Sequence, residues 1–187
     1  MLFWITIILF CVYVGMELFL LATRRGRQSA KRDDRGTIQA AWILIAGGCI
    51  AGFYLSTLFP ALNWPHYVAI VLVGDLLLVA GIVVRIWAIR HLGKLFTVDV
   101  GIQPGHHVVQ DGPFRFVRHP SYSGSLLAWT GVGLLTRNWL GFFVIVICTF
   151  VAYVLRISVE EKVLREKFGT EYDKYAARTK KMIPGIY

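Results

Sequence analysis

The sequence is poor in charge, and poorest in acidic residues. Only 17% of its 187 residues are charged, with 11 Asp and Glu against 20 Lys and Arg, while 56% are apolar. A soluble protein of this size needs more polar surface, so the composition argues against a soluble domain and favours a membrane protein. The mean hydropathy of +0.59 agrees. The net charge of +9 does not indicate nucleic-acid binding, because no basic stripe alternates with exposed aromatic residues and because Lys and Arg mark the cytoplasmic loops of membrane proteins.

Cysteine is also scarce, and its placement excludes a disulfide framework. The three cysteines, Cys11, Cys49 and Cys148, each lie in an apolar stretch, and none belongs to a Cys-x-x-Cys pair. Small buried apolar side chains are the simplest interpretation of all three. They give no indication of the redox compartment.

Several catalytic and binding motifs are missing. There is no His-Glu-x-x-His and no Cys/His ligand spacing, and the adjacent His106 and His107 cannot easily chelate one ion, so we expect no metal site. No Gly-x-Ser-x-Gly, P-loop or Gly-x-Gly-x-x-Gly occurs, and Gly131-Val-Gly133 lies inside an apolar stretch. A Rossmann-type nucleotide site is therefore not supported. No internal repeat is evident.

What the sequence does contain is a series of apolar stretches of membrane-spanning length. The first has 21 residues, which at about 1.5 Å per residue crosses a hydrocarbon core of about 30 Å. The fourth is short, and small residues at Gly47, Gly48 and Gly52 in the second have the spacing of a helix-packing face. The five predicted spans are residues 2–22, 38–60, 67–90, 121–136 and 139–157.

The loops predict how the spans are oriented. Residues 24–36 carry six Lys and Arg and should be cytoplasmic, which places the N-terminus outside. Residues 61–66 carry no Lys or Arg, and Arg137-Asn138 is too brief for more than a tight outer turn. Residues 158–178 have the pattern of an amphipathic surface helix, interrupted at Gly169. The predicted fold is a single all-α polytopic membrane domain, 1–187, with five transmembrane helices, a cytoplasmic C-terminus and a C-terminal amphipathic helix.

Ionisable residues inside the predicted spans need an explanation. Glu17 and Asp75 lie at depth, where such groups face protein or a watery cavity and serve either as structural polar contacts or as parts of a site. Arg85 and Arg90 lie near the inner end of the third span, and we expect them to extend to the cytoplasmic interface.

Two polar segments flank the last pair of spans. In the long loop 91–120, Pro120 suits the first turn of the fourth span and holds His119 extended, either as a helix-entry residue or as a ligand contact. At the end of the fifth span, Arg156 and Glu160 share one helical face with Tyr153. That pair is either an ordinary interfacial ion pair, worth about 0.3–0.5 kcal/mol, or a site. Folded together, the two segments are suited to hold a zwitterion at the membrane surface.

The C-terminal half resembles the isoprenylcysteine carboxyl methyltransferase family, within a wider group that includes phospholipid N-methyltransferases. The resemblance covers residues 106–122 and 156–187. The words that carry it are His106-His-Val-Val109, Gly112-Pro-Phe-Arg-Phe-Val-Arg-His-Pro-Ser-Tyr-Ser-Gly124, Arg156-Ile-Ser-Val-Glu-Glu-Lys-Val-Leu164, Phe168-Gly-Thr-Glu-Tyr172, Tyr175 and Ile183-Pro-Gly185.

The resemblance implies S-adenosylmethionine binding without a Rossmann fold, by segments 91–122 and 156–187. Arg156 resembles the substrate contact, and Phe114 stands where Tyr is common. Asp99 matches, loosely, a polar residue that family members use. The cofactor-binding residues implied are His106, His107, Val108, Val109, Phe114, His119, Pro120, Ser121, Tyr122 and Glu160.

The activity implied is methyl transfer to the carboxylate of a lipophilic, isoprenylcysteine-like substrate in the membrane, for which no general base is needed. Two alternatives stay open: an amine methyltransferase acting on a lipid headgroup, with Glu160, Glu161 or Asp99 as base, and a non-catalytic scaffold whose basic loops hold anionic lipid. Eukaryotic enzymes acting on prenylated proteins are expected to be longer. The five-span form resembles the short prokaryotic type, which suggests a prokaryotic plasma membrane and a small lipophilic carboxylate.

Overall fold

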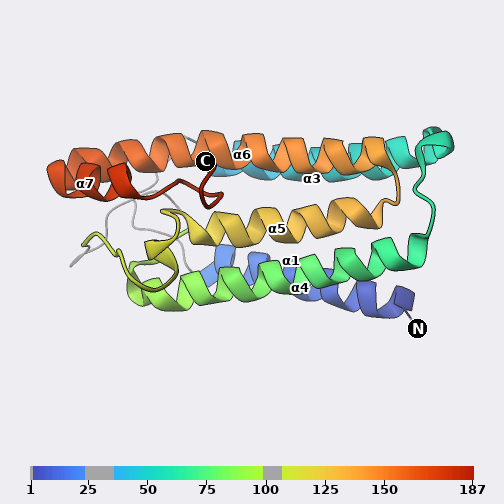
Figure 1. The fold of residues 1–187 in the computed structure, drawn as a ribbon, viewed down its shortest axis with the longest axis horizontal. Coiled ribbons are helices and arrows are strands. Elements are labelled where there is room, and N and C mark those ends of the chain that lie inside the picture. The colour runs from blue at the N-terminus through green and yellow to red at the C-terminus, as the bar shows by residue number, and fades with distance from the viewer. Residues whose placement is uncertain (1, 24–35, 99–106) are drawn as a thin grey trace.

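The protein is an elongated bundle of helices that run nearly side by side (Figure 1). The computed structural model describes residues 2–23, 36–98 and 107–187. Within these ranges the only β-type backbone pairs are two isolated bridges, Asn63 with Asn138 and Val117 with Lys180. No strand is formed there, so the all-α prediction is confirmed. The helices are α1 (Leu2–Thr23), α3 (Thr37–Leu58), η1 (Pro60–Leu62), α4 (Tyr67–Leu92), η2 (Gly93–Leu95), η3 (Gly112–Arg115), α5 (Pro120–Leu135), α6 (Trp139–Phe168) and α7 (Thr170–Arg178).

Four of these helices are long and apolar enough to cross a membrane: α1, α3, α4 and α6. They correspond to four of the five predicted spans. The fifth prediction, 121–136, corresponds to α5, which has 16 residues. At about 1.5 Å per residue that is about 24 Å, less than a hydrocarbon core of about 30 Å. The described residues therefore give four candidate spans and one shorter helix packed among them.

The structure corrects the predicted start of the surface helix 158–178. Residues 158–168 continue α6 without a break, because no Gly or Pro separates them from the apolar part. The predicted interruption at Gly169 is confirmed: φ is +50° there, and its amide bonds to the Arg165 carbonyl to end the helix. The shorter helix α7 follows. One continuous rod thus joins the apolar part of the bundle to the polar end.

Glycine allows the closest helix contacts. A Cβ on Gly81 of α4 would lie 2.4 Å from the Ala128 amide nitrogen, and one on Gly124 of α5 would lie 2.6 Å from the Arg85 nitrogen, so neither position accepts a side chain. Gly48 and Gly52 of α3 meet α6 in the same way, as predicted. Gly47 does not, because nothing lies within 4 Å of its Cβ position.

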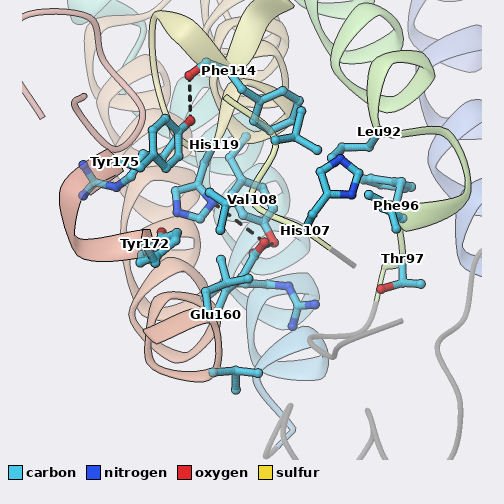
Figure 2. A pocket seen from close by; sticks show the side chains of 17 residues that line it. Leu92, Phe96, Thr97, His107, Val108, Phe114, His119, Glu160, Tyr172 and Tyr175 are labelled. Carbon is cyan, nitrogen blue, oxygen red and sulfur yellow. Dashed lines mark hydrogen bonds and ion pairs between the residues drawn. The ribbon is translucent and has the colours of Figure 1, made fainter. Parts of the chain in front are cut away.

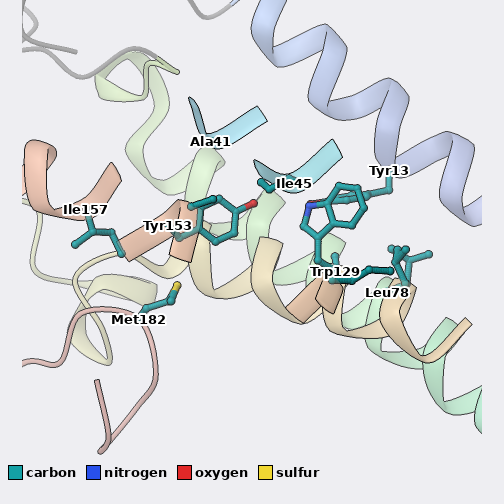
Figure 3. Packing of buried hydrophobic residues seen from close by; sticks show 12 residues of the cluster. Tyr13, Ala41, Ile45, Leu78, Trp129, Tyr153, Ile157 and Met182 are labelled. Atoms are coloured by element: carbon teal, nitrogen blue, oxygen red, sulfur yellow. The ribbon is translucent and has the colours of Figure 1, made fainter. Parts of the chain in front are cut away.

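The apolar core joins α1, α3, α4, α5 and α6 (Figure 3). The Tyr13 ring packs edge-on against Trp129, with ring centroids 5.6 Å apart. The Tyr13 hydroxyl is 2.6 Å from Ser125 Oγ, which also bonds to the Tyr153 hydroxyl. A buried chain of three hydroxyls therefore ties α1, α5 and α6 together, and each hydroxyl is satisfied at depth.

Glu17, Asp75 and Arg85, which lie inside the spans, each contact a side chain on another helix. Arg85 does not extend to the interface, which corrects the prediction: it is buried and forms a two-point ion pair with Glu17, one contact of which, Nη2 to Oε2, is 2.6 Å. Arg90, by contrast, is exposed. Asp75 accepts a hydrogen bond of 2.9 Å from Thr6 Oγ1. Both acids thus link α1 to α4.

The α5–α6 turn closes the end of the bundle opposite α7 (Figure 1). Asn138 is fully buried there and caps α6: its Oδ1 accepts from the amides of Leu140 and Gly141. Its Nδ2 donates to Phe59 O at 2.8 Å and to Asn63 Oδ1 at 2.9 Å. The predicted tight turn is confirmed, and it is fastened to the end of α3.

Candidate functional site

A cavity opens at the polar end of the bundle, between the end of α4, the segment 107–119, the start of α5, the last turns of α6 and α7 (Figure 2). Its empty volume is about 900 Å³, including the part open to solvent. We call it the first cavity. It is lined by Leu92, Leu95, Phe96, Thr97, His107, Val108, Val109, Phe114, Arg118, His119, Tyr122, Arg156, Glu160, Val163, Leu164, Tyr172 and Tyr175.

The first cavity brings most of the predicted site residues together. Those that line it are His107, Val108, Val109, Phe114, His119, Tyr122, Arg156 and Glu160. Pro120 and Ser121 are not in its lining: Pro120 opens α5, and Ser121 accepts from Arg85 through both its hydroxyl and its carbonyl oxygen. His106 and Asp99 lie outside the described residues, as does nearly all of the predicted cytoplasmic loop 24–36.

Local backbone geometry fixes the position of His119 in the lining of the first cavity. Pro120 is the first residue of α5, and His119 precedes it in a non-helical conformation with φ −125°. The His119 amide donates to Lys181 O at 2.8 Å, so the chain's C-terminal segment holds it from outside. The rings of His119 and Tyr122 stack with centroids 5.8 Å apart, and Tyr122 stacks on Tyr153 at 5.1 Å. This aromatic column leads from the cavity toward the core.

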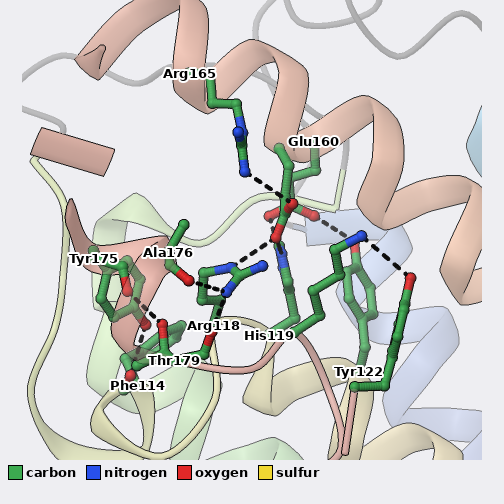
Figure 4. A network of polar contacts seen from close by, with 12 residues as sticks. Phe114, Arg118, His119, Tyr122, Glu160, Arg165, Tyr175, Ala176 and Thr179 are labelled. Carbon is green, nitrogen blue, oxygen red and sulfur yellow. Dashed lines mark hydrogen bonds and ion pairs between the residues drawn. The ribbon is translucent and has the colours of Figure 1, made fainter. Parts of the chain in front are cut away.

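Of the two adjacent carboxylates on α6, Glu161 contacts Arg118 and His119, which Figure 4 shows within a network of polar contacts. Arg118 Nε donates to Glu161 at 2.8 Å, and His119 Nε2 lies 3.4 Å away. Both Arg118 and Glu161 have side chains only 7% exposed. Arg118 also donates to the carbonyl oxygens of Ala176 and Thr179. This network joins α6, the His119 segment and α7.

Glu160 instead faces the first cavity. It accepts one hydrogen bond of 2.8 Å, from the Tyr122 hydroxyl, while its other oxygen is 3.8 Å from His119 Nδ1. Its side chain is 31% exposed. The interfacial ion pair with Arg156 that spacing allowed is therefore not what holds Glu160, which keeps a carboxylate oxygen for a ligand.

Aromatic side chains form the wall beside η3 and α7. Phe114 is buried and stacks on His91, and its carbonyl oxygen accepts from the Tyr175 hydroxyl at 2.6 Å. Burial raises the pKa of Tyr175 to about 12, so its hydroxyl is a stable donor. Burial also raises the pKa of Tyr172. The Tyr172 hydroxyl is buried without any hydrogen-bond partner among the described residues, which is unusual for a buried polar group.

Part of the lining was not singled out from the sequence. Arg118, Tyr172 and Tyr175 stood inside the quoted motif words without an assigned role. Val163 and Leu164 carried the apolar pattern of the predicted surface helix, which indicated burial but not a cavity. Leu92, Leu95, Phe96 and Thr97 lie inside the predicted cofactor-binding segment 91–122 but were not singled out individually; they enter the site because α4 ends there.

A second cavity lies deeper, among α1, α3, α4, α5 and α6, with an empty volume of about 560 Å³. It is lined by Glu17, Ile38, Ala41, Trp42, Ile45, Arg85, Phe96, Thr97, Val98, Tyr122, Trp129, Tyr153 and Arg156. It is mainly apolar and aromatic, and its ionic pair Glu17–Arg85 is internally neutral. Four residues line both cavities: Phe96, Thr97, Tyr122 and Arg156.

Arg156 lies at the junction of the two cavities. It is 4% exposed, and Nη1 donates to Thr37 Oγ1 at 3.0 Å while Nη2 donates to the Val98 carbonyl oxygen. The guanidinium is therefore held in one orientation by α3 and by the segment after η2. Glu160 lies one turn further along α6.

Metal ligands do not cluster in the part of the chain that the structure describes. No group of three or more His, Cys, Asp or Glu side chains lies close enough together there to hold an ion. The polar groups of the first cavity are instead a carboxylate, imidazoles, hydroxyls and guanidinium groups, a set that binds organic ions.

The sequence defines the class of this protein: the chain belongs to the phospholipid methyltransferase family, whose model matches residues 69–171. It is an integral membrane protein of that family. Particular relatives are isoprenylcysteine O-methyltransferases. The chain is 26% identical over 185 residues to a probable protein-S-isoprenylcysteine O-methyltransferase of Oryza sativa, covering 98% of this chain and 96% of that protein. It is 33% identical over 115 residues to the Saccharomyces cerevisiae enzyme, covering 60% of this chain and 48% of that one.

A solved structure agrees with these relatives. The fold matches that of a eukaryotic intramembrane Ras methyltransferase, isoprenylcysteine carboxyl methyltransferase, with a TM-score of 0.64 and 28% identity. The match covers 78% of this chain and 52% of that one, so the chain spans about half the length of the solved protein. The expectation that eukaryotic relatives are longer holds for that protein and the yeast enzyme, but it is wrong for the rice relative, which is nearly the same length as this chain.

Proposed function

We propose that the protein transfers a methyl group from S-adenosylmethionine to the carboxylate of a lipophilic, isoprenylcysteine-like acceptor. The observation that carries the proposal is the junction of the two cavities. A cavity at the bundle end, where Glu160, His107 and His119 lie among apolar and aromatic side chains, and a deeper, more apolar cavity share Tyr122 and Arg156, so a donor and a lipophilic acceptor placed in them would meet at these side chains.

The residues of the first cavity fit the donor. S-adenosylmethionine carries an ammonium, a sulfonium, ribose hydroxyls and an aromatic base. Glu160 offers a carboxylate oxygen to a cation or to hydroxyls, and the rings of Phe114 and His119 offer faces to the base or the sulfonium. The buried Tyr172 hydroxyl lacks a protein partner, and a ligand in the cavity would supply one.

The second cavity fits a lipophilic tail with a charged head. Its apolar wall comes from α3 and α5, including Trp42 and Trp129, and Arg156 stands at the end nearest the first cavity. Hydrogen bonds to Thr37 Oγ1 and the Val98 carbonyl oxygen orient the Arg156 guanidinium, which would attract the carboxylate of an acceptor in this cavity.

The chemistry asks little of the protein beyond placement. When bound, S-adenosylmethionine supplies a methyl group on a positively charged sulfur. A carboxylate acceptor is already ionised at neutral pH, so no residue has to remove a proton. Arg156 orients the acceptor, Glu160 and Tyr122 orient the donor, and the aromatic column of His119, Tyr122 and Tyr153 keeps water from the junction.

The same proposal includes the topology. We place the first cavity, α7 and the extension of α6 on the cytoplasmic side, where a soluble cofactor is available, and the N-terminus outside, with α5 as a fifth, short membrane-embedded helix. The basic residues of segment 24–36 and the uncharged connection 61–66 support this orientation. A prokaryotic plasma membrane stays a proposal, which chain length does not support because the rice relative has nearly the same length.

Titration of the purified protein with S-adenosylhomocysteine tests the donor site. Saturable binding is expected, and its absence would favour a non-catalytic scaffold. Methyl transfer to farnesylcysteine and geranylgeranylcysteine analogues then tests the acceptor. Turnover with these carboxylates, and none with their methyl esters, is the expected result.

A second candidate is methylation of a phospholipid amine, which the family description favours. That reaction needs a base for the ammonium proton, and Glu161 is occupied by Arg118 and His119. A guanidinium at the junction also repels a cationic acceptor. Transfer to phosphatidylethanolamine, with no transfer to the prenylcysteine analogues, would replace the proposed function with this one.

A further inference from the structure

The chain does not stop at α7 but turns back along the bundle. Residues 179–187, which we call the C-terminal hook, run from α7 to a C-terminus beside α6 (Figure 1). Met182 is buried in the core cluster with Tyr153 and Ile157 (Figure 3), and the Tyr187 ring lies 5.7 Å from that of Phe150. Phe150 belongs to the apolar part of α6. The hook therefore reaches from the polar end down to the level of the membrane-spanning helices.

The hook borders a basic cavity distinct from the two described above. Its empty volume is about 650 Å³, including open solvent, and its lining contains no acidic residue. Three of its cations, Arg178, Lys180 and Lys181, form no ion pair in the described part of the chain. Arg178 donates to the neutral Gln110 amide, and Lys181 lies over the Tyr187 ring at 5.0 Å. The lining is thus predominantly cationic: Arg118 is paired with Glu161, and Tyr187 carries a terminal carboxylate that accepts from the Met182 and Ile183 amides, but Arg178, Lys180 and Lys181 remain without an ion pair among the described residues.

An apolar edge adjoins these cations. Ile186 is 76% exposed, and Tyr187 lies beside it with the Lys181 ammonium over its ring. An exposed aliphatic side chain and a half-buried aromatic one next to Lys and Arg are typical of the membrane interface. A soluble anion has no use for the apolar edge, whereas a phospholipid uses both: its phosphate meets the cations and its glycerol and acyl carbons meet Ile186.

We propose that this basic cavity binds the headgroup phosphate of an anionic phospholipid, and that the bound lipid steadies the wall of the first cavity. The coupling runs through the hook's backbone. Lys180 O accepts from the Arg118 amide and Lys181 O from the His119 amide, each at 2.8 Å, and Met182 O accepts from Ser123 Oγ at 2.5 Å. A lipid that fixes residues 180–182 fixes the segment that carries His119. This second part rests on the proposed function, whereas lipid binding does not.

Lipid retention tests the site without reference to catalysis. The full chain is placed in nanodiscs of phosphatidylcholine mixed with phosphatidylglycerol, then extracted, and the lipid retained is measured by native mass spectrometry. Retention of phosphatidylglycerol over phosphatidylcholine is expected, and it should fall about tenfold or more in the triple variant R178Q/K180Q/K181Q. The matched control K162Q/K167Q/K174Q removes the same charge from exposed positions of α6 and α7 outside the cavity. Equal loss in both variants would mean diffuse attraction and overturn the site.

Competition with inorganic phosphate tests whether the cavity binds a phospholipid or any phosphate anion. Inorganic phosphate added to the same extracted protein should displace little phosphatidylglycerol, because it cannot use the apolar edge. Complete displacement at low millimolar phosphate would show an anion site with no lipid preference and overturn the proposal.

The coupling between the basic cavity and the first cavity is measured as the effect of phosphatidylglycerol on S-adenosylhomocysteine affinity. Phosphatidylglycerol in the nanodisc should tighten S-adenosylhomocysteine binding about threefold to tenfold in the wild type and in the control variant, and leave the R178Q/K180Q/K181Q variant unchanged. A lipid effect that persists in that variant defeats the coupling while leaving the site intact. If S-adenosylhomocysteine binds under no condition, the proposed function and the coupling fall together, and lipid retention still decides the site.

Discussion

The two ends of the bundle solve the same problem of buried polar groups in opposite ways. At the α5–α6 turn, Asn138 is fully buried, and each of its side-chain atoms is bonded to the surrounding chain. At the opposite end, Tyr172 keeps a buried hydroxyl without a partner among the described residues, and Glu160 keeps a carboxylate oxygen turned to a cavity. Asn138 needs no further partner, although Trp64 Nε1 beside it is buried without one in the described part of the chain, whereas Glu160 and Tyr172 face a cavity in which a ligand could bind them.

The difference gives a way to separate structural from functional polar residues. A polar side chain whose hydrogen bonds all end on the protein stabilises the fold, and its loss lowers the free energy of unfolding. A buried polar side chain with an unused hydrogen-bond donor or acceptor lowers the free energy of unfolding. Its removal should therefore affect ligand binding more than stability. The neighbours Glu161 and Glu160 show both cases on a single helical turn.

Arg156 should show the largest effect on turnover. Arg156→Ala removes the cation at the junction, and we expect methyl transfer to fall about 10³-fold, which corresponds to about 4 kcal/mol, with S-adenosylhomocysteine affinity nearly unchanged. Radiolabelled methyl transfer and calorimetric binding give the two numbers. Arg156→Lys, which keeps the charge without the fork, should retain a measurable part of the rate. Equal losses of turnover and donor affinity in Arg156→Ala would defeat the assigned role.

Glu161 should matter mainly for stability. Glu161→Gln leaves the Arg118 guanidinium buried without its counter-charge, and we expect the free energy of unfolding to fall by about 3 kcal/mol. The neighbouring Glu160→Gln should keep the wild-type stability and weaken S-adenosylhomocysteine binding about tenfold instead. Denaturation in detergent and calorimetric titration of both variants test the contrast, and a reversal of the two patterns would remove the distinction drawn here.

Substitution of Asn138 tests the end of the bundle at the α5–α6 turn. Asn138→Ala deletes the cap of α6 and leaves Asn63 Oδ1 and the Phe59 carbonyl oxygen without the donor that Asn138 supplies, so a loss of about 2 kcal/mol in stability is expected. Donor affinity should not change, because the cavity is at the other end. Asn138→Asp keeps the capping oxygen but turns a second acceptor toward the Phe59 carbonyl oxygen and Asn63 Oδ1 at a buried site, so it should be at least as destabilising as Asn138→Ala. A weakened donor affinity in a folded Asn138→Ala protein would mean that the ends are not independent.

Tyr172 should give the smallest change. Tyr172→Phe removes one unpartnered hydroxyl, so the folded protein loses no hydrogen bond and its melting temperature should hold or rise. Donor affinity should fall about fivefold, or about 1 kcal/mol, if a ligand supplies the missing partner. Tyr175→Phe is the matched control, since that hydroxyl already donates to Phe114 O and its loss should lower stability instead. An unchanged affinity in Tyr172→Phe would exclude the hydroxyl from the site.

The parts of the fold that depend on local pattern were predictable. Apolar length identified α1, α3, α4 and α6, Gly169 marked the break before α7, and Pro120 marked the start of α5. The extent of α6 was not, because a helix that leaves a membrane changes its surface pattern without changing its backbone, and the change of pattern at Ile157 was taken for a boundary.

The long-range pairings could not be predicted from one sequence. Glu17 and Arg85 are 68 positions apart, and nothing in either span indicates its partner. An arginine near the end of a span more often extends outward, so the general rule failed where a specific acid was available at depth. The Glu160–Tyr122 contact, by contrast, was within reach, because both lay in words that the family resemblance had already placed in one pocket. Which of the two adjacent glutamates faces the cavity required the coordinates.

The unbroken course of α6 has a mechanical consequence. Arg156 and Glu160, the proposed acceptor and donor contacts, are mounted four residues apart on one stiff helix of 30 residues. At about 1.5 Å per residue their separation along the axis is about 6 Å, and no loop movement alters it. Helix α6 therefore fixes the alignment of the proposed donor and acceptor. The step left to be controlled is the binding of each molecule, the donor from water and the acceptor from the membrane.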